Sequence, residues 1–238
     1  MMNNQIMLYD YYAVIVSDSL NTERHAHIAH QITYSLDARP FRIDINDHVE
    51  STSAIFIPSQ VNHKFLDEKG KFLSILIDNE SIFNGEEISV KLRSVEKIPK
   101  EAEEIETLLK KLGLMNASQD SRIVETLGLI NKAENLEDIR LVDISQNVGL
   151  SESRLLHLFK SEVGVPFRKY ILWKKLRKAI SEFSTIDGRS LTDIALASGF
   201  SDSAHLSKVV KASFGLSPSE ILKNSQFIKD SSKSSELL

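Results

Sequence analysis

An internal repeat in the C-terminal half limits the fold of this 238-residue chain more than any other part of its sequence. The segment DISQNVGLS, which begins at Asp143, recurs as DIALASGFS from Asp193, an offset of 50 residues. The segments that follow, LLHLFKSEVGVPF and LSKVVKASFGLSP, match again if the second copy has one extra residue before Leu206, which makes the offset 51. Two copies of one unit are therefore predicted to form the same local structure twice.

Each copy carries the residue types that a helix-turn-helix unit needs. An isoleucine is followed by a small residue, which lets two helices cross closely, and then by a glycine, which can adopt the positive φ of a sharp turn. A serine two positions after the glycine can cap a new helix. These residues are Ser145 and Ala195, Gly149 and Gly199, and Ser151 and Ser201. One such pattern also occurs in helical hairpins of enzymes, but two copies in one chain favour a DNA-binding motif.

The helix after each turn is predicted to have one buried and one exposed face. The residues expected in the core are Leu155, Leu158 and Phe159 in the first copy and Leu206, Val209 and Val210 in the second. The outward positions carry side chains suited to base edges and phosphates. We predict DNA contacts at Ser153, Arg154, Leu156, His157 and Lys160 in the first copy and at Ser203, Ala204, Ser207, Lys208 and Lys211 in the second.

The charge of the chain is distributed unevenly around a formal net charge of −4. Residues 120–228 contain 15 Lys and Arg against 13 Asp and Glu, whereas the rest of the chain contains 14 against 20. Between Arg154 and Lys178 there are eight cations and a single acid, Glu162. Such a stripe could bind phosphates, or it could be a solvated helix face.

A basic segment between the two copies, residues 166–184, reads as one helix of 19 residues. At 1.5 Å per residue this helix would span about 28 Å. Successive major grooves on one face of DNA lie about 34 Å apart. The segment could therefore hold two recognition helices near neighbouring grooves.

From Ser121 to about Phe227 the sequence resembles the AraC/XylS family of bacterial regulators. The resemblance rests on GLSESRLLHLFKSEVGVPFRKY, the basic segment, SLTDIALASGF and FGLSPSEIL, in that order and spacing. It implies a seven-helix domain whose helices beginning at Ser151 and Ser201 lie in successive major grooves. By position, the resemblance assigns base reading to Ser153, Arg154, Leu156 and His157 in the first copy and to Ser203, Ala204, Ser207 and Lys208 in the second. Leu156 and Ala204 replace polar side chains often seen in the family, so the second unit in particular is expected to make phosphate and methyl contacts.

The first 95 or so residues read as short strands separated by turn residues. Apolar runs and alternation predict strands at residues 11–16, 28–36, 41–45, 54–57 and 72–77. The predicted fold class is α+β: an N-terminal β-barrel or sandwich with helices, resembling the cupin-like sensor domain of the family, followed by an all-α domain with two helix-turn-helix units and a linker helix. The expected domains are residues 1–95 for the sensor, 96–119 for a helix and linker, 120–228 for DNA binding and 229–238 for a disordered tail.

Near Pro99 the apolar period changes to about 3.5, which predicts a helix from Lys100 to Leu112 that ends at Gly113. Its apolar stripe could pack within its own domain or against a second copy of the chain. Because the resemblance favours the second arrangement, we expect a homodimer contact formed by Ala102, Ile105, Leu109 and Leu112.

Histidines in the N-terminal half present a candidate metal site. His25 and His27 alternate, so on a strand they would share a face, and His63 follows later in the chain. The expected carboxylate ligand is missing, because Gln31 occupies roughly its place. We therefore expect ordinary pocket or surface histidines with no metal and no cofactor, and the effector-binding residues stay unknown. The alternative is a metal-dependent cupin enzyme fused to a DNA-binding domain, with His25, His27 and His63 as ligands.

The composition narrows the function further. The chain has no cysteine, which excludes disulfides, thiolate metal sites and the DNA-repair methyltransferases that carry a similar DNA-binding domain and need an acceptor cysteine. The sequence has neither a signal-peptide pattern nor an apolar run of about 20 residues. We expect a cytoplasmic, non-enzymatic transcription regulator that binds double-stranded DNA as a homodimer, responds to a small-molecule effector and makes no membrane contact. RNA polymerase is a further candidate partner.

Overall fold

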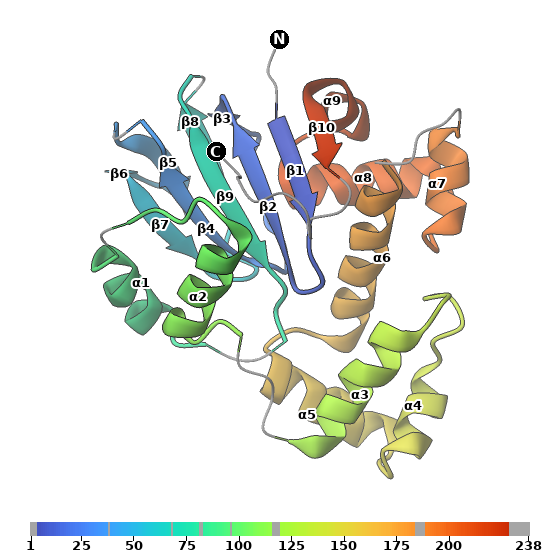
Figure 1. Ribbon diagram of the computed structural model, residues 1–238. Helices are drawn as coiled ribbons and strands as arrows, with labels where there is room; N and C mark the ends of the chain where they lie inside the picture. The colour runs from blue at the N-terminus through green and yellow to red at the C-terminus, as the bar shows by residue number, and fades with distance from the viewer. Residues whose placement is uncertain are drawn as a thin grey trace. The chain divides into compact units, whose positions relative to one another are not determined.

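The computed structural model of the protein describes residues 4–37, 39–67, 69–80, 83–95, 97–115, 120–183 and 189–228. Its contacts divide the chain into two compact units, whose elements are drawn in Figure 1. Unit 1 consists of Met1–Asp78, Phe83–Met115 and Ser207–Leu238, and unit 2 consists of Asn79–Ile82 and Asn116–Leu206. The expected boundary at residues 116–119 and the expected tail at 229–238 lie outside the described residues, and the expected domain limits stay a prediction.

Unit 1 is built on two β-sheets. The larger sheet has the strand order β10-β1-β2-β9-β4-β7. Its strands are β1 (Asn4–Leu8), β2 (Tyr12–Ser17), β4 (His30–Ser35), β7 (Ala54–Ile57), β9 (Phe72–Ile77) and β10 (Ser225–Ile228). The last strand, β10, comes from the C-terminal end of the chain and pairs in parallel with β1.

The smaller sheet has the order β3-β8-β5-β6, formed by β3 (Leu20–Asn21), β5 (Phe41–Ile45), β6 (His48–Thr52) and β8 (His63–Asp67). Side chains from both sheets meet in one apolar cluster of Leu20, Phe41, Ile43, Ile55, Ile57, Phe65 and Phe72. The described strands therefore form a sandwich and not a closed barrel, which confirms the sandwich form of the predicted fold.

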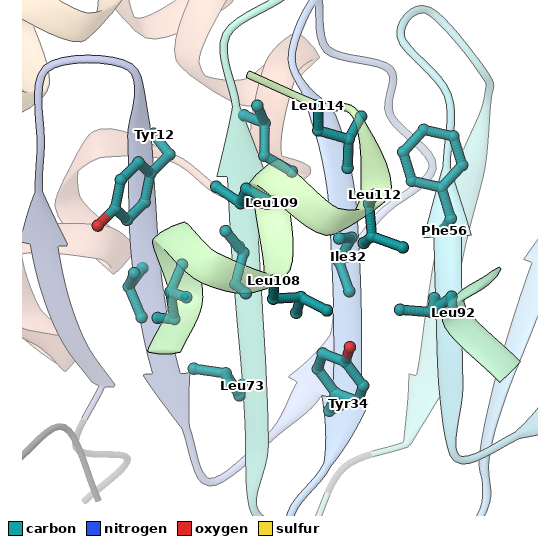
Figure 2. Packing of buried hydrophobic residues seen from close by; sticks show 14 of the residues in the cluster. Tyr12, Ile32, Tyr34, Phe56, Leu73, Leu92, Leu108, Leu109, Leu112 and Leu114 are labelled. Carbon is teal, nitrogen blue, oxygen red and sulfur yellow. The ribbon is translucent and has the colours of Figure 1, made fainter. Parts of the chain in front are cut away.

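Two helices cover the other face of the larger sheet: α1 (Gly85–Arg93) and α2 (Ala102–Leu112). Figure 2 shows Leu108, Leu109 and Leu112 of α2 among Tyr12, Ile32, Tyr34 and Leu73 of the strands. Ile105 and Leu109 are fully buried there. The stripe predicted for a homodimer contact thus belongs to the core of unit 1, and only Ala102 is partly exposed. The reason for this correction is Leu108, which widens the apolar face so that it matches a sheet surface instead of a partner helix.

The five strands predicted from apolar patterns are present in the structure, with ends that differ by at most two residues. The strands that sequence analysis did not identify are β1, β3, β6, β8 and β10. Their patterns are short or polar; β6, for example, has the sequence HVEST and is mostly exposed. A strand of this kind is stabilised by its neighbours in the sheet, so its own residues give little signal.

Unit 2 and the adjoining C-terminal segment contain the seven helices expected from the resemblance. They are α3 (Ser121–Lys132), α4 (Leu141–Asn147), α5 (Glu152–Val163), α6 (Phe167–Phe183), α7 (Leu191–Ala197), α8 (Ser203–Phe214) and α9 (Pro218–Asn224). The predicted helix at residues 166–184 is α6. Among the described residues, no helix combines the length and hydrophobicity that crossing a membrane requires.

Candidate nucleic-acid interface and histidine cluster

The first helix-turn-helix unit consists of α4, a tight turn and α5. Gly149 has φ 65° in this turn, and a Cβ atom there would have no neighbour within 4 Å, so the position requires glycine for its backbone conformation and not for space. Ser151 caps α5, its side chain accepting a hydrogen bond from the Arg154 amide at 3.4 Å. Ser145, the small residue of this copy, is buried. The local structure is thus the one that the repeat indicates.

The outward face of α5 is exposed. Leu155 and Phe159 are fully buried, and Leu158 is partly buried. The predicted DNA contacts of this helix, Ser153, Arg154, Leu156, His157 and Lys160, are all exposed. Within the described part of the chain, neither Arg154 nor Lys160 has an ion-pair partner, so both charges are available to an anionic ligand.

The second unit consists of α7 and α8, and its local structure repeats the first. Helices α4 and α7 begin 50 residues apart, and α5 and α8 begin 51 residues apart, which is the offset deduced from the sequence. Gly199 has φ 81° at the turn. The predicted cap is wrong by one residue: Asp202 accepts the hydrogen bond from the His205 amide at 2.7 Å, and the Ser201 hydroxyl contacts the Asp202 carboxylate and the His205 ring.

The exposed face of α8 differs from that of α5. Ala204, Lys208 and Lys211 are exposed, whereas Ser203 and Ser207 are half-buried. Lys211 Nζ lies 3.1 Å from a carboxylate oxygen of Glu23, and both residues belong to unit 1. The sequence carries no signal for this pairing, because the two residues are far apart in the chain.

The basic helix α6 stabilises the fold of unit 2 and also contributes positive charge to it. Lys175 Nζ donates a hydrogen bond of 2.7 Å to the Gly199 carbonyl, and Lys178 Nζ donates one of 3.0 Å to the Glu134 carbonyl. Lys174 lies 5.7 Å from the centre of the Tyr170 ring. Arg168 and Lys169 are exposed. The stripe is therefore divided between lysines that hold neighbouring segments and cations that face solvent.

The three histidines singled out in the N-terminal half come together in unit 1. His25, His27 and His63 are all buried, and one ligand nitrogen from each lies within 4.8 Å of the others. The backbones of His25 and His63 pair through two hydrogen bonds of 3.0 and 2.9 Å. Strand pairing therefore brings together residues that are 38 positions apart.

The hydrogen bonds of the cluster define its tautomers. The Nδ1 atoms of His25, His27 and His63 lie 2.8, 2.8 and 2.9 Å from the carbonyl oxygens of Glu23, Ala29 and Val61. Since a carbonyl oxygen can only accept, each Nδ1 carries the proton in the neutral ring. Burial, and then the other histidines, lower the pKa of His25 to about 3, and burial and His27 lower the pKa of His63 to about 4. Burial also lowers the pKa of His27. The rings are therefore neutral at pH 7, with an unprotonated Nε2.

A line of polar side chains continues from the cluster into the sandwich. Gln31 Oε1 lies 2.8 Å from His27 Nε2, and Gln31 Nε2 donates to Thr33 Oγ1 at 2.8 Å. Thr33 Oγ1 is 3.0 Å from Ser74 Oγ, and the whole line is buried. Gln31, in roughly the place of the missing carboxylate, is thus beside the cluster as the sequence indicated. Thr33 and Ser74 were not predicted, because hydroxyl residues on strands are common in sheets without any ligand.

The C-terminal half matches known proteins in sequence. A family model described as a helix-turn-helix domain matches residues 144–224. The Msm operon regulatory protein of Streptococcus mutans is 33% identical over 89 residues, which is 37% of this chain and 31% of that protein. An uncharacterized HTH-type transcriptional regulator of Staphylococcus aureus is 35% identical over 75 residues, 32% of this chain and 10% of that protein. The chain therefore spans less than a third of the length of these curated relatives.

Most of the chain also matches solved structures of ToxT from Vibrio cholerae in fold. An apo form has a TM-score of 0.57 at 16% identity, covering 90% of this chain and 97% of that one. A form with an unsaturated fatty acid bound has a TM-score of 0.56 at 16% identity, covering 89% and 95%. At this identity the likeness shows a shared fold. The matched residues 144–224 include both helix-turn-helix units in the order that the sequence motifs predict, so this part of the chain is a helix-turn-helix domain.

Proposed function

We propose that this protein is a sequence-specific DNA-binding transcription regulator. The observation that carries the proposal is the pair of helix-turn-helix units, whose second helices begin 51 residues apart and each expose basic side chains. In such a unit the second helix enters the major groove. Two units on one chain can read two successive grooves, and because their exposed residues differ, the site they read is asymmetric.

The exposed residues of α5 divide by chemistry. Arg154 can bond two acceptors of a guanine edge, and His157 lies one turn further along the same face. Lys160 follows at the far end of the exposed face, where a cation would meet phosphate. In α8, Ala204 can contact a thymine methyl group, and Lys208 and Lys211 can bind phosphate.

The N-terminal sandwich is the proposed effector domain. The polar line from His27 through Gln31 and Thr33 to Ser74 gives its interior the hydrogen-bonding groups that a small molecule requires. ToxT, which shares the fold, has been solved with an unsaturated fatty acid bound, and this supports a small-molecule effector in the present chain without indicating its chemistry. A homodimer and contact with RNA polymerase belong to the same proposal.

The proposal is tested by selecting bound sequences from random double-stranded DNA with the full chain. We expect an asymmetric consensus, and Arg154→Ala should relax it at one or two base pairs. The control is Lys71→Ala, which removes an exposed charge outside both helix-turn-helix units and should leave the consensus unchanged. Recovery of random sequences with the unaltered chain would refute specific DNA binding.

The convergence of His25, His27 and His63 favours a second candidate, a metal-dependent cupin enzyme fused to a DNA-binding domain. Catalysis needs a coordination position left open to a substrate, whereas a regulator needs only a bound state that differs from the free state. Metal analysis of the purified protein followed by assays for oxidation or hydrolysis separates the two candidates. Turnover that is lost in His63→Gln would favour the enzyme.

A further inference from the structure

We infer that His25, His27 and His63 bind a divalent transition-metal ion, and that segment 23–27 transmits its presence to the second recognition helix, α8. The inference deepens the proposed function, on which its DNA-binding consequence rests. It has two parts, a donor set and a mechanical connection, and each is carried by contacts inside unit 1.

The donor set is prepared for a cation. All three Nδ1 atoms are oriented by backbone carbonyls, which is how proteins fix the ring and tautomer of a metal-binding histidine. His63 Nε2 is buried and has no hydrogen-bond partner in the described residues. Gln31 Oε1 lies 2.8 Å from His27 Nε2, which places the amide group beside the donor set. A positive ion accepts the lone pair that His63 Nε2 leaves unpaired and can share those of the neighbouring rings.

The chemistry of the donors indicates the class of metal. Imidazole nitrogens suit zinc, copper, iron and nickel, whereas calcium and magnesium prefer oxygen. Nitrogens that share one ion at 2.0 to 2.1 Å lie about 3.3 Å apart in a tetrahedral site, so rotations of the rings must bring together atoms that now lie within 4.8 Å of one another. Gln31, which is neutral, occupies the place where a carboxylate would supply negative charge. The donor set is therefore neutral, and the site has a net positive charge when it holds a metal ion.

The mechanical connection runs through the segment that carries the first histidine. His25 Nδ1 donates to the Glu23 carbonyl at 2.8 Å. The Glu23 amide donates to the Gly215 carbonyl, and the Ala26 amide donates to the Ala212 carbonyl, both at 3.3 Å. Ala212 is in the last turn of α8, and Gly215 follows its end. Glu23 is two positions from His25 and Ala26 is next to it, so a change at His25 reaches α8 directly.

Close packing at Gly215 makes the connection sensitive. A Cβ atom on Gly215 would lie 2.5 Å from the Glu23 carbonyl oxygen and 3.0 Å from His25 Nδ1. The position has φ 67°, which also favours glycine. The end of α8 therefore fits against segment 23–25 with no room for a side chain.

The bound state should hold α8 in this docked position. Coordination through Nε2 keeps the Nδ1 proton on His25, which preserves its bond to Glu23 and the backbone bonds from that segment to α8. In the docked position Lys211 is paired with Glu23 and is therefore not available to bind DNA phosphate. Because a ligand stabilises the state that it binds better, the metal ion should weaken DNA binding and a chelator should strengthen it.

Metal binding is tested on the full chain with Co²⁺, whose visible absorption reports histidine coordination in a protein without cysteine, and with Zn²⁺ by competition. His63→Gln should weaken Co²⁺ binding at least about tenfold. Loss of a residue that only orients a metal ligand already lowers metal affinity by about that factor, and loss of a ligand should lower it at least as much. His30→Gln, a buried histidine outside the cluster, and His48→Gln, an exposed one, should bind as the unaltered chain does. Absence of Co²⁺ absorption, or equal loss in the three variants, would overturn the site.

The connection is tested by comparing two glycines in the same backbone conformation. Gly215→Ala should weaken Co²⁺ binding about fivefold or more, because coupling between two sites is reciprocal. Gly149→Ala imposes similar backbone strain where no atom is near, and should leave the affinity unchanged. Glu23→Gln, which weakens an exposed ion pair alone, provides a milder variant with the same direction of effect and keeps the test decisive if Gly215→Ala does not fold. Equal metal affinities in folded Gly215→Ala, Glu23→Gln and the unaltered chain would refute the connection.

Hydrogen exchange gives a readout that does not depend on DNA. Zn²⁺ should slow exchange of the Glu23 and Ala26 amides, whose acceptors are in the α8 segment, and His63→Gln should abolish the slowing. DNA affinity is then measured with Zn²⁺ and with a chelator, and we expect a difference of about fivefold or more. If the protein binds no DNA in either condition, the proposed function fails while the exchange result still decides this inference. If DNA binds equally well in both, the regulatory inference fails and the proposed function stands.

Discussion

Single residues on the exposed face of α5 are expected to make contacts of different kinds. Arg154 is near the N-terminal end of the helix and Lys160 near its C-terminal end, and both are exposed without an ion-pair partner among the described residues. A guanidinium that bonds a base edge discriminates between sequences, whereas an ammonium on phosphate does not. Substitutions at the two positions should therefore give different signatures.

Arg154→Ala should cost about 1 to 3 kcal/mol on the preferred site and relax the preference at one or two base pairs. Lys160→Ala should weaken binding to all sequences alike and reduce the salt slope by about one. Titrations on preferred and scrambled DNA at several salt concentrations measure both effects. If both variants keep the full sequence preference, α5 does not read bases.

At the scale of elements, α2 and α6 each serve the interior of their own unit. The apolar side of α2 packs on the larger sheet, with Ile105 and Leu109 fully buried. In α6, residues such as Tyr170 and Leu176 are buried, while two of its lysines bond carbonyl groups of neighbouring segments. The buried sides of both helices thus stabilise the units to which they belong.

The double variant Ile105→Glu, Leu109→Glu should unfold unit 1, because two carboxylates would be buried without partners. The expected loss is more than about 4 kcal/mol, which is a large fraction of the usual domain stability of about 5 to 15 kcal/mol. Thr107→Glu, on the exposed side of the same helix, is the control and should change stability little. Thermal melting and sedimentation decide the matter, and a folded double variant that becomes monomeric would restore the dimer contact first expected from the sequence.

Lys175 and Arg168 should differ in their effect on DNA binding although both are basic residues of α6. Lys175 Nζ is committed to the Gly199 carbonyl, so Lys175→Met should loosen the second turn without altering the salt slope. Arg168 is exposed, and Arg168→Ala should reduce the slope by about one if it binds phosphate. Equal slopes for the two variants would mean that α6 makes no phosphate contact at Arg168.

At the scale of the whole molecule, the chain passes from unit 2 to unit 1 within α8, the second of the two proposed recognition helices. Leu206 belongs to unit 2 and Ser207 to unit 1, and both are in α8. The segment ends with β10, which extends the larger sheet next to β1. The part of α8 from Ser207 onward thus belongs to the same unit as the sandwich.

Footprinting with the full chain should reveal protection over about two helical turns of an asymmetric site, because the two recognition helices have different exposed residues. The half of the site read by α5 should be protected at lower protein concentration than the half read by α8, since Lys211 must first leave Glu23. Glu23→Gln should reduce this difference. Protection of one groove only, at every concentration, would count against reading by both units.

The sequence by itself determined the repeated helix-turn-helix structure, because its signals are local. Gly149 and Gly199 have positive φ at the predicted turns, Ser151 is the predicted cap, and the extra residue in the second copy appears as the offset of 51 between α5 and α8. Interactions within a few residues suffice for such a motif, so one sequence window contains what is needed to predict it. The cap at Asp202 in place of Ser201 is the small error that this reasoning allows.

Only the tertiary structure decided which distant residues meet. Strand register brings His63 to His25, β10 joins β1, and Lys211 pairs with Glu23, yet none of these partners lies within 35 residues of the other. The stripe on α2 is compatible with a sheet or with a partner helix, and only the presence of the larger sheet selects between them. Such contacts depend on the order of strands and on packing across the chain, which a local pattern of residues does not encode.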